Sequence, residues 1–372
     1  MSARSGQGLS SVLLAGGGSA GHVSPLLALA DCLRRRDPDL RVTALGTQNG
    51  LEQRLVPARG YDLRTIPKVA FPRRPGGALG RLPRALKAAV DAAGAAMDAT
   101  SPDVVVGFGG YVSSPAYLAA RKRKIPIVVH EQNSRPGLAN RLGARLTPYV
   151  ATTFASTSLA HATAIGMPLR REIAVLDRAA RRSEALAHFG LDDHRPTLLV
   201  TGGSLGAQRL NAAFASQVDA LRARGIQVLH ITGLGKAFAQ DSKMTGPPYV
   251  VADYVDRMDL AYAAADLVVA RSGANTVCEL TAVGLPAVYV PLPIGNGEQR
   301  FNAADVVAAG GGILLDDSAL TPQWIEEALV PLVTDGPRIA GMARAAATIG
   351  EREADERLAD LVAVAADSRG VR

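Results

Sequence analysis

Cysteine and aromatic residues are scarce in this chain of 372 residues. The two cysteines, Cys32 and Cys278, form neither a C-x-x-C motif nor a framework of paired positions, which excludes a disulfide-rich scaffold and indicates a reducing compartment. Aromatic residues make up 4% of the chain, fewer than a protein that stacks on single-stranded nucleic acid would carry, so we expect no nucleic-acid partner. No cluster of histidine, cysteine or aspartate has metal-ligand spacing, and we expect neither a metal nor a cofactor.

Long apolar runs are also missing. The short run at 12–15 ends in glycines and is too short for the core of a signal peptide. No stretch approaches the roughly 18 apolar residues that a spanning helix needs, so we expect no membrane span.

The composition that remains is globular, with 48% hydrophobic and 20% charged residues. A chain of this length fits two α/β domains better than a single core. The net charge is +7, and arginine supplies most of the positive side chains. Such an excess fits anionic lipid or phosphate-bearing substrates without choosing between them.

Strand-like and helix-like segments alternate along the chain, as in βαβ units with a parallel sheet. In the first half, the predicted strands are 11–15, 41–45, 104–107, 125–130 and 147–152. After Gly166-Met167-Pro168 the pattern restarts, with predicted strands at 197–201, 228–232, 249–251, 267–270 and 287–291. The predicted helices include 25–36, 208–224, 258–265 and 276–283, and an alanine-rich helical stretch at about 337–366.

This pattern predicts an α/β fold of two Rossmann-like, doubly wound parallel-sheet domains that face a cleft, the default ligand site. We assign residues 1–168 to the first domain and 169–345 to the second, with the C-terminal helix, about 346–372, packing back on the first. A weak internal repeat supports two similar halves, because 13–21 and 198–206 each contain an apolar strand, then glycines and a serine.

Four predicted strand-to-helix turns are rich in glycine or small residues, at 16–22, 107–114, 202–208 and 271–276. Such turns let backbone N–H groups approach an anion at a helix N-terminus. One turn alone is weak evidence, because glycines also permit close packing of helix and strand. Four turns, two in each half, favour a protein that handles two phosphorylated ligands.

The nucleotide motifs leave one alternative open. No G-x-x-x-x-G-K-[ST] is present, which argues against P-loop chemistry. Gly16, Gly18 and Gly21 match G-x-G-x-x-G, but Leu45-Gly46-Thr47 stands where a dinucleotide-binding protein would carry an acidic residue. From the residues alone, an NAD-dependent oxidoreductase therefore remains the second hypothesis.

Several motifs resemble those of one family. The segments 15–23, 109–113, 130–133, 166–170 and 202–207 follow its order, and the most specific are 271–279, 284–286 and 298–302. Together they resemble the MurG-type N-acetylglucosamine transferases over residues 12–305, nearly the whole chain. The resemblance implies a GT-B fold and inverting transfer from UDP-N-acetylglucosamine to the C4 hydroxyl of the lipid-linked N-acetylmuramyl pentapeptide (lipid I). Ser19-Ala20 and Glu298 depart from the family's commonest residues.

The resemblance also implies a donor site. Glu279 would accept hydrogen bonds from the ribose hydroxyls, for which a carboxylate is suited because it only accepts. The simpler interpretation is an acidic residue near a helix N-terminus. The full set of donor-binding candidates is Ser19, Ala20, Gly21, Asn133, Arg170, Ser204, Val255, Ala274, Asn275, Thr276, Val277, Cys278, Glu279, Glu298 and Gln299.

The acceptor and the catalytic base are expected in the first domain. His22 is the first candidate for the base, since an imidazole with a reference pKa of about 6.5 works at neutral pH. Glu131 is the second catalytic candidate, and a purely structural histidine is the alternative for His22. The acceptor-binding candidates are Gly17, Gly18, Gly109, Gly110, Tyr111, His130 and Asn140.

A lipid-linked acceptor implies a peripheral enzyme on an anionic membrane surface, at the cytoplasmic face of a bacterial cell, with other cell-wall synthesis proteins as partners. Residues 71–90 are the candidate membrane surface, because Phe71, Leu79, Leu82 and Leu86 are apolar and the three leucines recur at helical spacing among basic residues. The alternative is an ordinary amphipathic helix whose leucines face the core. A related transferase with another acceptor and a non-catalytic membrane-surface protein are further hypotheses.

Overall fold

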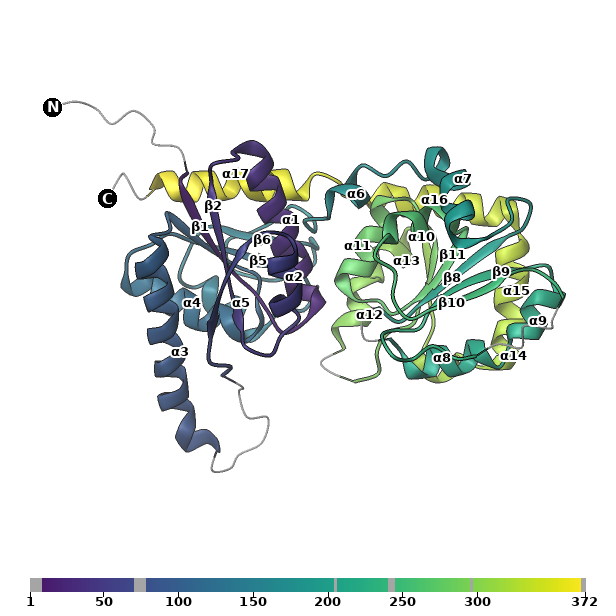
Figure 1. The fold of residues 1–372 in the computed structure, drawn as a ribbon, viewed down its shortest axis with the longest axis horizontal. Coiled ribbons are helices and arrows are strands. Elements are labelled where there is room, and N and C mark those ends of the chain that lie inside the picture. Colours follow the sequence, from purple (N-terminus) through teal and green to yellow (C-terminus); the bar gives the residue numbers. More distant parts are fainter. Residues whose placement is uncertain (1–8, 70–77, 204–205, 240–244, 295–296, 369–372) are drawn as a thin grey trace. The chain divides into compact units, whose positions relative to one another are not determined.

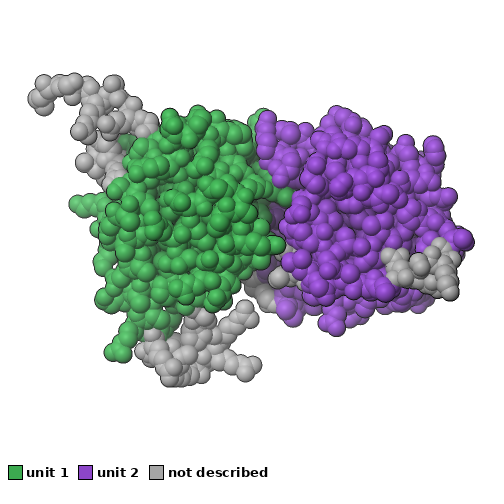
Figure 2. Space-filling view, viewed as in Figure 1, with its two compact units in different colours: residues 1–170, 353–372 green, residues 171–352 purple. Residues whose placement is uncertain are grey.

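The computed structural model describes residues 9–69, 78–203, 206–239, 245–294 and 297–368. The chain forms two compact units, coloured separately in Figure 2: residues 1–170 with 353–372, and residues 171–352. Our prediction divided the chain after residue 168 and returned it to the first domain at about residue 346. Each unit is a parallel sheet with helices, as the alternating pattern predicts.

The first unit contains seven parallel strands in the order β3-β2-β1-β4-β5-β6-β7. Its strands are β1 (Ser11–Ala15), β2 (Arg41–Thr47), β3 (Asp62–Ile66), β4 (Val104–Gly107), β5 (Ile127–Glu131), β6 (Val150–Thr152) and β7 (Ala162–Ala164). Its helices are α1 (Ala20–Arg36), α2 (Glu52–Ala58), α3 (Ala78–Thr100), α4 (Gly110–Lys122), α5 (Leu138–Gly143) and α17 (Ala354–Asp367).

Both faces of this sheet are covered, which explains the near-continuous apolar runs of β1 and β4. Val12 and Leu14 belong to one core cluster, together with residues of α1 and α17. Leu13 and Ala15 belong to the cluster on the other face, with residues of α3 and α4. Figure 1 shows α17, in yellow, beside α1.

The second unit contains six parallel strands in the order β10-β9-β8-β11-β12-β13. They are β8 (Thr197–Thr201), β9 (Gln227–Ile231), β10 (Tyr249–Ala252), β11 (Leu267–Ala270), β12 (Ala287–Tyr289) and β13 (Gly312–Leu314). The α-helices are α6 (Arg171–Ala174), α7 (Arg178–Phe189), α8 (Gln208–Ala215), α9 (Val218–Ala223), α10 (Met258–Ala264), α11 (Ala274–Ala282), α12 (Glu298–Asn302), α13 (Ala304–Ala308), α14 (Pro322–Trp324), α15 (Val330–Thr334) and α16 (Gly336–Ile349). A 3₁₀ turn (Asp317–Ala319) and a π-helical turn (Ile325–Leu329) complete it.

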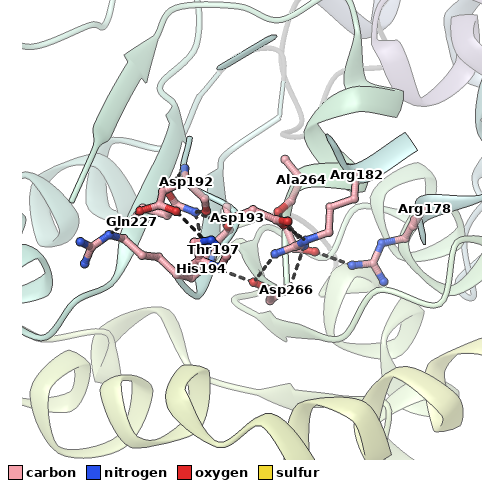
Figure 3. A network of polar contacts seen from close by, with 11 residues as sticks. Arg178, Arg182, Asp192, Asp193, His194, Thr197, Gln227, Ala264 and Asp266 are labelled. Atoms are coloured by element: carbon pink, nitrogen blue, oxygen red, sulfur yellow. Dashed lines mark hydrogen bonds and ion pairs between the residues drawn. The ribbon is translucent and has the colours of Figure 1, made fainter. Parts of the chain in front are cut away.

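A polar network ties α7 to the amino-terminal edge of this second sheet (Figure 3). Asp266 accepts from the Thr197 N–H at 2.8 Å and from the Arg182 guanidinium at 3.0 Å. Arg178 donates to the carbonyl oxygens of Tyr262, Ala265 and Gly284, and burial lowers its pKa to about 10. The network secures the end of the sheet opposite the predicted glycine turns.

Three helix predictions differ from the structure. Helix α1 starts at Ala20, not at Pro25, because it follows the glycine turn directly and accommodates the proline inside. The predicted helix 208–224 is two helices, α8 and α9. The alanine-rich stretch is also two helices, α16 and α17, and a Cβ at Gly350 between them would come within 2.4 Å of the Thr281 carbonyl oxygen.

Candidate functional site

The candidate residues of the first unit gather at the carboxyl ends of three neighbouring strands, β1, β4 and β5. The first glycine turn follows β1, Gly109-Gly110 follows β4, and His130-Glu131 ends β5. Parallel strands place their carboxyl ends at one edge, where open α/β sheets bind ligands. The spacing in the sequence thus becomes a cluster in space.

A buried carboxylate that we did not predict shapes the first glycine turn. Glu52, at the start of α2, is 1% exposed. It accepts hydrogen bonds from the Gly18 N–H at 2.9 Å and from the N–H and hydroxyl of Thr47, each at 2.8 Å. Burial acts to raise the pKa of Glu52, but these hydrogen bonds outweigh it and hold that pKa below its ordinary value.

Glycine is required around Glu52 because the carboxylate takes the space of side chains. A Cβ would lie 2.5 Å from Glu52 if added at Gly17, 2.4 Å at Gly46 and 2.0 Å at Gly50. Gly18 also has φ +88, which favours glycine. We predicted that Gly17 and Gly18 bind the acceptor. The Gly18 N–H, however, already donates to the Glu52 carboxylate.

The second glycine turn packs against the imidazole of His22. Gly109 and Gly110 have φ +84 and +76. A Cβ at Gly110 would come within 2.8 Å of the Gly17 carbonyl oxygen and 3.1 Å of His22 Cδ2. A Cβ at Gly109 would come within 3.2 Å of Asn140 Nδ2 and 3.3 Å of His22 Cε1. The two turns therefore meet around His22, and both glycines are needed to admit its ring.

His22 is the half-buried end of a hydrogen-bonded chain of side chains. Its Nδ1 lies 3.1 Å from Gln132 Oε1. Gln132 Nε2 lies 3.0 Å from His130 Nδ1 and 2.8 Å from the His130 carbonyl oxygen. His130 Nε2 lies 3.0 Å from the Gly166 carbonyl oxygen. Burial lowers the pKa of His130 to about 4, so this imidazole is neutral at physiological pH.

Glu131 is occupied by the loop that follows it. One carboxylate oxygen accepts from the Asn133 N–H at 2.9 Å. The other accepts from the Gly137 N–H at 3.0 Å and from Asn140 Nδ2 at 2.9 Å. Asn140 also accepts from the hydroxyl of Tyr117 at 2.8 Å. Glu131 and Asn140 therefore shape the loop at 133–140, which is a different task from accepting a proton from a substrate.

The remaining candidates of this unit lie around these turns. Ser19 is the N-cap of α1, followed by Ala20 and Gly21 in its first turn. Tyr111 is 40% exposed, and the Lys68 ammonium lies 5.1 Å from the centroid of its ring. Arg170 is the half-buried last residue before the second unit. Ser19, Ala20, Gly21, Asn133 and Arg170, all predicted to bind the donor, thus belong to the first unit.

In the second unit, the candidates centre on the turn between β11 and α11. Arg271 donates to the carbonyl oxygens of Val290 and Pro291, at 3.1 and 3.2 Å, and forms an ion pair with Asp317 at 2.6 Å. Asn302 Nδ2 donates to the Ser272 carbonyl oxygen at 3.3 Å. These contacts fix the turn that leads into α11, whose N-terminus offers partial positive charge.

Glu279 lies in the second turn of α11, half-buried, and is oriented by a tyrosine that we did not predict. The Tyr262 hydroxyl, from α10, donates to Glu279 Oε2 at 2.7 Å. The side chain of Val277 is 3% exposed and belongs to the buried core. Burial raises the pKa of the Cys278 thiol, which is therefore neutral. Ala274, Asn275 and Thr276 form the first turn of the helix.

The predicted sugar contacts begin α12. Gly297, with φ +75, precedes Glu298, and Gln299 Oε1 accepts from the Leu292 N–H at 3.0 Å. Gln299 therefore supports the loop before it. Val255 is half-buried after β10. Ser204 lies outside the described residues.

One group of three potential metal ligands occurs in the described part of the chain: Cys32, Asp355 and Glu356. Burial raises the pKa of the Cys32 thiol to about 12. Arg35 lies 2.8 Å from Asp355, and Arg36 lies 2.7 Å from Glu356. A neutral thiol and two carboxylates already paired with arginines are poor ligands for a cation.

Comparison with known proteins assigns the family. The N-terminal domain of glycosyltransferase family 28 matches residues 12–152, and the C-terminal domain of that family matches residues 197–358. The chain belongs to glycosyltransferase family 28. Its two parallel-sheet units are those of a GT-B glycosyltransferase, as the motifs predicted.

Similar proteins cover nearly the whole chain. A Nocardioides protein named UDP-N-acetylglucosamine–N-acetylmuramyl-(pentapeptide) pyrophosphoryl-undecaprenol N-acetylglucosamine transferase is 60% identical over 94% of this chain and 97% of its own. A Streptomyces coelicolor protein of the same name is 55% identical over 96% of this chain and 99% of its own. The crystal structure of Acinetobacter baumannii MurG has a TM-score of 0.75 and 28% identity, covering 95% of this chain and 99% of that one.

Three residues that orient the candidate site were not predicted from the sequence: Glu52, Gln132 and Tyr262. Glu52 had a signal, since Gly46 and Gly50 precede it closely and it is the acidic first residue of its helix. Gln132 stood inside a motif whose neighbours we had chosen. Tyr262 had no local signal, because only the fold brings α10 beside α11.

Proposed function

We propose that this protein transfers N-acetylglucosamine from UDP-N-acetylglucosamine to the C4 hydroxyl of N-acetylmuramyl-(pentapeptide)-diphospho-undecaprenol, with inversion at the sugar carbon. The observation that carries the proposal is the 60% identity, over 94% of this chain, with a relative named for this donor and acceptor. The reaction would serve peptidoglycan synthesis, and through it cell shape and division.

Donor binding is proposed for the second unit. The N-terminus of α11 supplies N–H groups for the diphosphate. Glu279, oriented by Tyr262 at 2.7 Å, accepts from the ribose hydroxyls. Glu298 and Gln299 are the proposed contacts of the sugar. No metal is required, since helix ends and side chains stabilise the departing diphosphate.

The acceptor and the base are proposed for the first unit. The two glycine turns leave His22 between them, and its Nε2 is the atom not engaged by Gln132. We propose that Nε2 takes the proton of the C4 hydroxyl as the oxygen attacks the sugar carbon and UDP departs. Glu131 is the less suitable base, because its carboxylate accepts from Asn133, Gly137 and Asn140.

A lipid-linked acceptor further suggests peripheral attachment at the cytoplasmic face of the bacterial membrane. Within the described residues, no helix has both the length and the apolar character that crossing a bilayer requires. One part of our predicted membrane surface is wrong: Leu82 and Leu86 pack against the core cluster that contains Leu13 and Val105. The other apolar residues of that surface, Phe71 and Leu79, lie where side chains are not described, so they remain a prediction.

The test is a panel of acceptors offered with UDP-N-acetylglucosamine. We expect product with a soluble lipid I analogue and none with a diacylglycerol or a natural-product aglycone. If another acceptor is turned over at a higher kcat/KM, the proposed acceptor is wrong, although the protein is still a glycosyltransferase. The His22→Ala variant is the control for background hydrolysis.

A further inference from the structure

The proton on the His22 imidazole decides whether His22 can act as a base. A neutral imidazole carries its single proton on Nδ1 or on Nε2, and only the other nitrogen can accept one. Nδ1 of His22 faces Gln132, so catalysis through Nε2 needs the proton to reside on Nδ1. The neighbours of Gln132 determine which tautomer forms.

The orientation of the Gln132 amide follows from a backbone carbonyl. The end assigned as Nε2 lies 2.8 Å from the His130 carbonyl oxygen, which can only accept. That end must therefore be the –NH₂ group, and the end facing His22 at 3.1 Å must be the oxygen. Because an amide oxygen only accepts, the hydrogen between them belongs to His22 Nδ1.

A second carbonyl anchors the far end of the chain. His130 Nε2 lies 3.0 Å from the Gly166 carbonyl oxygen and must donate to it. Its Nδ1 then has a lone pair, which accepts from Gln132 Nε2 at 3.0 Å. His130 is fully buried and Gln132 is 1% exposed, so water does not compete for these groups. All three side-chain hydrogen bonds therefore run in one direction. His22 donates to Gln132, Gln132 donates to His130, and His130 donates to the Gly166 carbonyl oxygen.

We infer that Gln132, fixed by His130, is a positioning residue that holds His22 as the Nδ1–H tautomer and leaves its Nε2 lone pair for the acceptor hydroxyl. The inference rests on the proposed function, since His22 is the proposed base. When Nε2 takes the proton, His22 becomes an imidazolium whose Nδ1–H still donates to the Gln132 oxygen. No proton moves along the chain, and the bond to Gln132 is kept through the reaction.

The direct test reads the tautomer. The six histidines of the chain are labelled with ¹⁵N, and a long-range ¹H–¹⁵N spectrum of the whole protein is recorded above pH 7.5. Loss of one set of signals in His22→Ala assigns His22. We expect a protonated Nδ1 and an unprotonated Nε2 for His22, and the reverse for His130. A protonated Nε2 on His22 in the wild-type protein would overturn the inference, and this measurement needs no folded variant of Gln132.

Variants of Gln132 test the consequence. Gln132→Met removes the acceptor, so His22 should show averaged or Nε2–H signals, and kcat should fall about 10- to 100-fold, as for the loss of an orienting partner. The donor KM should stay within about twofold, whereas a general disturbance would change it. If the His22 signals are unchanged in folded Gln132→Met, Gln132 does not determine the tautomer and the inference is wrong.

Gln53→Met is the matched control, since its exposed amide donates to the Thr47 carbonyl oxygen in the same unit. It should leave both the His22 signals and kcat unchanged. The two ideas fail separately. If His22→Ala lowers kcat by less than threefold, His22 is not the base, although its tautomer can still be the predicted one. If the tautomer is wrong while His22→Ala is inactive, only the role of Gln132 falls.

Discussion

Individual carboxylates in this protein differ in their hydrogen-bond partners. Both carboxylate oxygens of Glu52, and both of Glu131, accept hydrogen bonds from N–H and amide groups of their own unit. Glu279 accepts from the Tyr262 hydroxyl and is half-buried in the second turn of α11. At the residue scale, these hydrogen bonds give Glu52 and Glu131 structural roles, whereas Glu279 is the carboxylate that we propose for the ribose hydroxyls.

Removing the Glu279 carboxylate should weaken donor binding. Glu279→Ala should raise the KM for UDP-N-acetylglucosamine about 10- to 150-fold, because hydrogen bonds to a charged group contribute about 1.5–3 kcal/mol. Tyr262→Phe should raise it about 2- to 10-fold, since the carboxylate remains and only its orientation is lost. Tyr249→Phe, which removes another buried hydroxyl of this unit, is the control and should leave the donor KM unchanged. An unaltered KM in folded Glu279→Ala removes Glu279 from the site.

Removing the His22 imidazole should affect chemistry more than binding. His22→Ala should lower kcat about 10²- to 10⁴-fold, the usual contribution of a general base. Steady-state kinetics with both substrates varied separate kcat from the two KM values. A decrease in the acceptor kcat/KM that arises from KM alone would make His22 a binding residue instead.

At the scale of elements, the glycine turns make room for side chains of the protein itself. Gly17, Gly46 and Gly50 make room for Glu52, and Gly109 and Gly110 make room for His22. The turn after β1 therefore depends on a carboxylate contributed by α2, some thirty residues away in the chain. The N–H groups available to an anion are fewer than the number of glycines indicates.

The role of Glu52 predicts a dependence of stability on pH. Because its pKa in the folded protein is lowered, Glu52 adds stability that is fully present above the unfolded value of about 4.3 and is lost as the pH falls through the lowered pKa. Glu52→Gln should lower the free energy of unfolding by about 1–3 kcal/mol at pH 7. The difference from wild type should shrink below about pH 4. Thermal unfolding at pH 7, 5 and 3.5 measures it, with Asp62→Asn on edge strand β3 as the control; a difference independent of pH contradicts this account.

Sequence patterns predicted the buried strands well and the edge strands poorly. β1, β4 and β11 are buried throughout and almost entirely apolar, so their positions could be recognised. β3 and β7 are edge strands whose residues are mostly exposed, and we did not predict them. The candidate site was predicted as motifs, but Tyr262 could not be, because α10 and α11 meet only through tertiary packing. The role of Gln132 could not be predicted either, because it follows from the directions of hydrogen bonds that only the folded structure forms.

At the scale of the whole molecule, the chain returns to its first unit at the end. α17 contributes Leu358, Ala359, Val362 and Ala365 to the core cluster that also contains Val12 and Leu14. Arg35 and Arg36 of α1 form ion pairs with its acidic residues. The last helix is therefore part of the core that supports β1 and its glycine turn.

This packing predicts different effects for two substitutions in α17. Leu358→Ala should destabilise the first unit by about 2–5 kcal/mol, the cost of truncating a fully buried leucine. Val364→Ala, at a position that is 57% exposed on the same helix, should change stability by less than about 0.5 kcal/mol. Urea unfolding followed by circular dichroism distinguishes them, and equal effects would show that α17 does not contribute to the core.

The central claim is the reaction itself, and the structure of the product tests it most directly. The wild-type protein is incubated with UDP-N-acetylglucosamine and a lipid I analogue, and the isolated product is examined by NMR. We predict a disaccharide in which N-acetylglucosamine is β-linked to the C4 hydroxyl of the N-acetylmuramyl residue, with UDP released in equal amount. An α-linkage, attachment at another hydroxyl, or UDP release without a disaccharide would contradict the account.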